Sequence, residues 1–114
     1  MTIENDDFEK SKAHIMVELL EYIPNAVQSM TIVKKLTGSI IVSAFDSGEG
    51  FNERTSAFDT FIQIIDGKAE IFINGKSRIL VTGDGIIIPA HESNSIRANE
   101  RFKMISTVIK SGYE

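Results

Sequence analysis

Three polar residues of one parity, Arg54, Ser56 and Thr60, have the types and spacing to do chemistry. Side chains separated by an even number of residues point to the same face of an extended segment. A guanidinium suits a carboxylate because its planar fork donates two parallel hydrogen bonds. The segment is therefore a candidate binding site for a small anion, with Arg54 as the charge anchor and two hydroxyls as further donors.

These three residues also have structural interpretations. Arg54 could lie in an exposed loop and pair with one of the nearby acids, which are Glu49, Glu53 and Asp59. The hydroxyls of Ser56 and Thr60 could bond to neighbouring backbone. The sequence leaves both interpretations open.

Two further residues, His91 and Asp59, could act as an acid or a base. An imidazole can serve as an acid or a base, but His91 lies in a turn-rich segment and could be a surface histidine. Asp59 has the opposite parity to Thr60, which favours a structural hydrogen bond over a catalytic role. Both are second-tier candidates.

The composition excludes several classes of partner. The net charge is −4, and no cluster of lysines and arginines could neutralise a nucleic-acid backbone. No apolar run approaches the roughly 20 residues that span a bilayer. The chain has no cysteine, and its N-terminus is acidic, unlike a secretory signal peptide. We expect a cytoplasmic protein that binds neither nucleic acid nor membrane.

Short apolar runs, separated by turns rich in glycine, asparagine and aspartate, extend from residue 26 to residue 110. This pattern predicts an antiparallel all-β barrel or sandwich with little helix. Asp66-Gly67 and Asn74-Gly75 are dipeptides typical of tight hairpins. We expect a hairpin at each.

Residues 1–25 form an N-terminal extension, and residues 26–114 form the barrel. The spacing of Ile15, Leu19 and Ile23 indicates a short helical turn within residues 14–23. Pro24 limits its length, because the proline ring removes a backbone donor. The rest of the extension is expected to be irregular or frayed.

Two runs, residues 40–45 and 86–88, are apolar at consecutive positions. A strand that is apolar on both faces needs cover on both. A second subunit could supply that cover, and we therefore predict a homodimer. Cover from residues 14–36 of the same chain is the alternative.

The segment from Gly83 to Asn94 resembles the second sequence motif of the cupins, with Gly83 and Pro89 in place. Other segments match cupin sequences in their order and spacing along the chain. They are residues 45–50, 58–59, 66–71 and 101–104. The region 48–110 resembles the small single-domain cupins, of the cupin type-2, conserved β-barrel, RmlC-like kind. The resemblance implies an antiparallel double-stranded β-helix, which is a jelly-roll barrel.

The four places that hold metal ligands in cupins contain Arg54, Ser56, Thr60 and Asn94 here. Iron, manganese, nickel and zinc prefer imidazole and carboxylate ligands. A guanidinium stays protonated and repels a cation. We therefore predict no metal or other cofactor at the usual position, and the resemblance places these four side chains around the barrel lumen.

Three functions remain open. The first is a metal-free cupin that binds a small polar or anionic metabolite in the lumen through Arg54. The second is a metal-dependent cupin enzyme, an oxygenase, isomerase or decarboxylase, whose divalent metal sits in a rearranged site built from His91, Asp59 or Glu53. The third is a structural or interaction module with a packed lumen.

Overall fold

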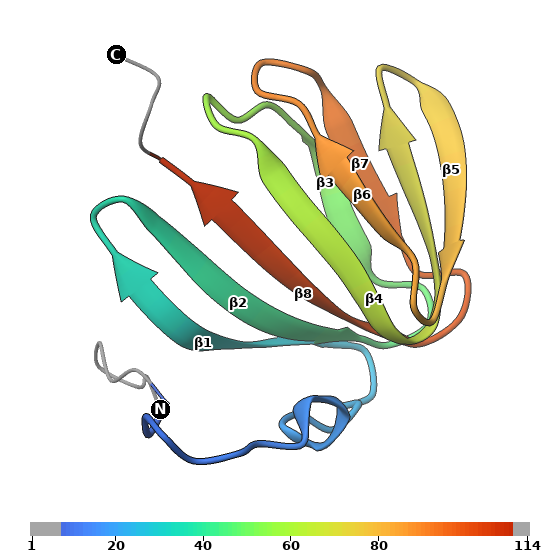
Figure 1. The fold of residues 1–114 in the computed structure, drawn as a ribbon. Coiled ribbons are helices and arrows are strands. Elements are labelled where there is room, and N and C mark those ends of the chain that lie inside the picture. Colours follow the sequence, from blue (N-terminus) through green and yellow to red (C-terminus); the bar gives the residue numbers. More distant parts are fainter. Residues whose placement is uncertain (1–7, 111–114) are drawn as a thin grey trace.

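Eight antiparallel strands form a curled sheet in the computed structural model, which describes residues 8–110 (Figure 1). The all-β expectation is confirmed, and the described helix is a single 3-10 turn, η1 (Met16–Glu18). The strands are β1 (Val27–Lys35), β2 (Gly38–Phe45), β3 (Gly50–Arg54), β4 (Thr60–Ile73), β5 (Lys76–Val81), β6 (Gly85–Ile88), β7 (Asn94–Arg97) and β8 (Phe102–Ile109).

The strand β4 joins two parts of the sheet. Its first half pairs with β8 and β6, and β8 continues through β2 to β1. Its second half pairs with β5 and β7, and β7 pairs with β3. The sheet curls around this strand, so that the two parts face each other across an interior.

The predicted hairpin at Asp66-Gly67 is wrong, because β4 runs through these residues. Gly67 has a φ of +88°, and the register with β8 shifts between Ile64 and Asp66. A side chain at Gly67 would also collide with the carbonyl oxygen of Arg101. Left-handed backbone at this point bends the strand from one part of the sheet into the other instead of reversing it.

The hairpin at Asn74-Gly75 is confirmed. Ile73 pairs with Lys76, and the two central residues have φ values of 51° and 78°. Positive φ at both positions is the property of a type I′ turn, whose twist matches that of the flanking strands. The local sequence is sufficient to define this turn.

The core fills one end of the barrel. Phe45 and Phe102 are fully buried and stacked with ring centroids 4.4 Å apart, and Phe51 meets Phe45 edge-on at 5.1 Å. Ile64 and Ile71 of β4 pack against them.

The N-terminal segment runs along the outside of the sheet (Figure 1). Leu20 packs on Val42 and Ala44 of β2, which are 0% and 1% exposed. The outer face of β2 is thus covered by the same chain, which was the alternative to cover by a second subunit. The dimer itself stays a prediction.

The short helical turn expected within residues 14–23 is the 3-10 turn η1. Ile15 and Ile23 are exposed, so their spacing does not mark a buried helical face. Instead, Lys103 Nζ donates a hydrogen bond of 2.6 Å to the carbonyl oxygen of Val17, and the N–H of Phe8 donates to Ile32 at 3.0 Å. Contacts with the sheet, not helical periodicity, fix this segment. Fraying was expected over residues 1–13; residues 8–13 are irregular, with Phe8 bonded to β1, and residues 1–7 lie outside the described residues.

The strand β6 is apolar on both faces but is covered on one. Ile88 is buried, whereas Ile87 is 61% exposed. Ile87 pairs with Phe61 of β4, which is 40% exposed. These two side chains form an apolar patch on the outer face of the sheet.

Candidate ligand site in the barrel lumen

A cavity of about 320 Å³ lies inside the barrel and borders the core at Phe51, Ile88 and Met104. Its polar lining comprises Arg54, Ser56, Thr60 and Asn94 together with Ser29, Ser43 and Ser106. Its apolar lining comprises Ile41, Phe51, Ile88, Met104 and Val108. The structure thus brings together the four residues that the sequence singled out, around one space.

Strand pairing explains how the lining converges. Thr60 pairs with Val108 on one side and Ile88 on the other, so the three point to the same face of the sheet. Side chains two residues apart on a strand point to the same face of the sheet. Ser106 and Ile41 continue this inward face on β8 and β2.

Arg54 ends β3 and lies at the cavity with its guanidinium over the Phe51 ring, 4.3 Å from the ring centroid. Among residues 8–110 it forms no ion pair with Glu49, Glu53 or another acid. Part of the residue is exposed, but burial of the guanidinium lowers its pKa from the ordinary value. An arginine keeps its proton even so. A positive charge therefore stands at the cavity without a counter-charge from the described chain.

Asn94 begins β7 opposite Arg54 and is 5% exposed. Its Nδ2 donates to the carbonyl oxygens of Arg54, at 3.3 Å, and Glu92, at 3.4 Å. Because both partners are acceptors, they define which end of the amide is the nitrogen. Asn94 Oδ1 is then a buried acceptor with no hydrogen-bond partner in the described part of the chain.

Three lining serines were missed by the sequence interpretation. The hydroxyls of Ser29 and Ser43 lie 2.8 Å apart, and Ser106 lies on the neighbouring strand β8. Ser43 and Ser106 are serines at inward positions of largely apolar strands, and that pattern could have identified them; β1, which carries Ser29, is mostly polar. Ser56 is partly committed to structure, because its Oγ accepts a hydrogen bond of 3.1 Å from the N–H of Phe58.

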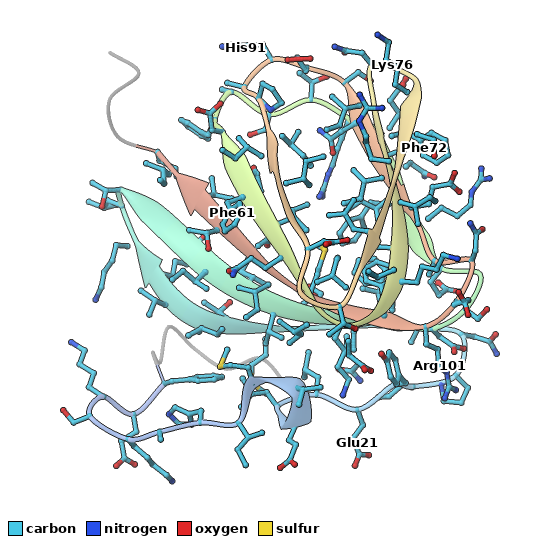
Figure 2. The ribbon with its side chains drawn as sticks, turned by 45° about the vertical axis from the view of Figure 1, so that its right-hand side comes forward. Glu21, Phe61, Phe72, Lys76, His91 and Arg101 are labelled. Carbon is cyan, nitrogen blue, oxygen red and sulfur yellow. The ribbon has the colours of Figure 1, made fainter. Side chains whose placement is uncertain are left out.

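His91 and Asp59 are not among the residues that line the cavity. His91 is exposed in the loop after β6, at the end of the barrel where Lys76 also lies and away from Arg101 (Figure 2). Its backbone N–H donates to Ser56 at 2.7 Å, and Asp59 Oδ1 accepts from the N–H of Ala90 at 2.8 Å. The two residues connect the loops at the cavity rim.

A larger hollow of about 440 Å³ lies on the outer side of β3 and β7. It is lined by charged side chains such as Glu53 and Arg97, which are exposed, and by the outer-facing Phe72. Apart from Phe51, it contains no residue of the lumen. The lumen, with its buried polar groups, is the stronger candidate site.

No protein-family model and no curated protein sequence matches the chain. Solved structures do. A cupin superfamily protein from Desulfitobacterium hafniense is 26% identical, with a TM-score of 0.85 over 94% of this chain and 98% of that one. The chain has the cupin fold.

Two other matches limit what the cupin fold says about activity. A conserved protein of unknown function from Streptococcus pyogenes is 24% identical, with a TM-score of 0.88 over 97% of each chain. A mutant of salicylate 1,2-dioxygenase from Pseudoaminobacter salicylatoxidans is 18% identical, with a TM-score of 0.68 over 73% of this chain and 26% of that one. Uncharacterised proteins and an enzyme thus share the fold, and the fold alone does not assign a reaction.

The lining residues do not fit the metal that the cupin fold implies. The ligand places hold a guanidinium, two hydroxyls and an amide whose nitrogen is bonded to backbone. Within residues 8–110, no group of three or more His, Cys, Asp or Glu side chains is placed to hold a metal ion. The donor set at the lumen therefore suits an anion better than a cation.

No helix within residues 8–110 has the length and apolar character to cross a membrane.

Proposed function

We propose that this cupin binds a small organic anion in its lumen and that Arg54 takes the place of the metal as the positive centre. The observation that carries the proposal is Arg54 itself, a cation at the cavity with no acidic partner among the described residues. A partly desolvated charge without a partner costs free energy, which an anionic ligand would recover.

The remaining lining supports a carboxylate of modest size. Thr60 presents a hydroxyl that can donate to an anion, and Ile41, Ile88 and Val108 form an apolar wall. A few orienting polar groups on a mostly apolar surface are typical of small-molecule sites. The volume of about 320 Å³ lies at the small end of such sites.

The two alternative functions have less support. A metal-dependent enzyme with a rearranged site needs His91, Asp59 or Glu53 to converge, and none of them lines the cavity. A packed structural module needs a filled lumen, which is at odds with the cavity beside Thr60 and Ser106.

A thermal-shift screen tests the proposal. Small carboxylates and their uncharged amides would be compared on the wild type, on Arg54→Ala and on Arg97→Ala. Arg97 is the matched control, because its guanidinium also lies near a phenylalanine ring, 5.5 Å from the Phe72 centroid, but outside the lumen. We expect carboxylates alone to raise the melting temperature, and only when Arg54 is present. Equal shifts in the wild type and Arg54→Ala would refute the proposal.

A further inference from the structure

We infer that the anion bound in the lumen is a polyhydroxylated carboxylic acid, with its carboxylate at Arg54 and its hydroxyls on the neighbouring Asn94 and on the serines of the opposite lining. This inference rests on the proposed function and specifies its ligand class. It follows from which lining groups can donate and which can accept hydrogen bonds.

Two lining groups have a single hydrogen-bonding role. The Arg54 guanidinium can only donate, so it needs an acceptor such as a carboxylate. Asn94 Oδ1 can only accept, and its nitrogen is occupied by the carbonyl oxygens of Arg54 and Glu92. Oδ1 is buried and without a partner in the described chain, and Asn94 lines the cavity. A ligand that satisfies both groups must therefore carry an acceptor with negative charge and also a donor.

The serines add groups that both donate and accept. Ser29, Ser43 and Ser106 lie on β1, β2 and β8, separated from β3 in the strand order by β4 and β7. The mutual bond of Ser29 and Ser43 uses one of their two hydrogens, so the pair keeps one donor and free lone pairs. Ligand hydroxyls have the same dual capacity. Hydroxyls along the carbon chain, remote from the carboxylate, match this lining.

Other classes of ligand would leave polar groups of the cavity lining without a hydrogen-bond partner. A plain fatty acid would satisfy Arg54 but would cover Ser43, Ser106 and Asn94 Oδ1 with carbon. A neutral polyol would satisfy the hydroxyls but would leave the guanidinium without its counter-charge. Unpaired buried polar groups are the means by which a site rejects an analogue that lacks a hydroxyl or a charge.

Titration calorimetry with matched probes tests the inference. Aldonic acids of three to six carbons, from glycerate to gluconate, would be compared with the unsubstituted carboxylic acids and the neutral polyols of the same chain length. In at least one length class, we expect the aldonate to bind about tenfold or more tightly than both matched compounds. Ser106→Ala should weaken the aldonate and leave the unsubstituted acid unchanged, whereas Ser77→Ala, outside the cavity, should change neither.

The outcomes separate this inference from the proposed function. If unsubstituted acids bind as tightly as aldonates and both need Arg54, the hydroxyl assignment is overturned and the anion site stands. If polyols equal aldonates in affinity, both ideas fail. If no probe of any length binds in an Arg54-dependent way, the anion site fails and the ligand class fails with it.

Discussion

Asn94 and Arg54 face each other across the β3–β7 pair, and the amide of Asn94 donates to the backbone carbonyl of Arg54 at 3.3 Å. The asparagine, at a place where cupins have a metal-binding histidine, thus holds the backbone of the residue that brings the positive charge. The same bond directs Nδ2 away from ligand binding and leaves Oδ1 as the acceptor. The side chain of Asn94 and the backbone of Arg54 are therefore linked in the structure.

Removing Leu20 should test whether the N-terminal segment is part of the fold. Leu20 is buried against Val42 and Ala44, and deleting such a side chain costs about 2–5 kcal/mol in a full core. We expect Leu20→Ala to lie near the lower end, about 2 kcal/mol, because the segment lies on the outside of the sheet. Leu36→Ala is the control, since Leu36 is 98% exposed, and should be neutral in urea unfolding. Equal stabilities of the two variants would contradict the described packing.

Gly67 should tolerate alanine much less well than Gly48. Both have a left-handed φ, of +88° and +91°. A side chain at Gly67 meets the carbonyl of Arg101, whereas one at Gly48 meets nothing within 4 Å. Gly48→Ala should lose about 1 kcal/mol from backbone strain alone, and Gly67→Ala should lose clearly more. Denaturant midpoints of both variants measure the difference, and a Gly67→Ala variant as stable as Gly48→Ala would show that the bend does not need glycine.

The turns and glycines of the sheet show which parts of the fold the sequence could predict. Asn74-Gly75 was predictable, because a type I′ turn depends on two residues alone. Gly67 was misassigned, because Asp66-Gly67 has the same local chemistry and only the approach of Arg101 makes it a bend. The cover of Val42 by Leu20 was left open for the same reason. It joins segments that are distant in sequence, and no local pattern specifies such contacts.

The candidate site also contains residues that the sequence could predict and residues that it could not. Parity and the cupin motif indicated Arg54 and Asn94, because a repeating strand geometry determines which side chains face inward. The pairing of Ser29 with Ser43 depends on the register of β1 against β2, which composition does not reveal.

Asp46 should make stability depend on pH in the acid range. Hydrogen bonds from Arg101, at 2.8 Å, and from the backbone N–H of Asn25, at 2.7 Å, lower the pKa of this carboxyl. A lowered folded-state pKa contributes stability above the unfolded-state value, near 4, that is lost as the pH falls through the folded-state value. Melting temperatures should therefore fall below about pH 4 and fall less steeply in Asp46→Asn. Parallel profiles for the two proteins would argue against this contribution.

We predict a homodimer whose interface is the outer patch formed by Phe61 and Ile87. These neighbouring side chains are 40% and 61% exposed, while the N-terminal segment covers the region around Val42. A second copy would remove the patch from water. Light scattering should give a dimer for the wild type and a monomer for the double variant Phe61→Lys/Ile87→Lys, because buried ammonium groups oppose association. A monomeric wild type would end this prediction.

The central claim, that Arg54 is the positive centre of a ligand site, is tested most directly by the dissociation constant of the best carboxylate from the screen. We expect Arg54→Ala to weaken it about ten- to a hundredfold, since a charge-assisted hydrogen bond is worth about 1.5–3 kcal/mol. Arg54→Lys should recover part of the affinity, because a point charge cannot make the bidentate contact. Equal dissociation constants for the wild type, Arg54→Ala and Arg54→Lys would contradict the claim and place Arg54 outside the site.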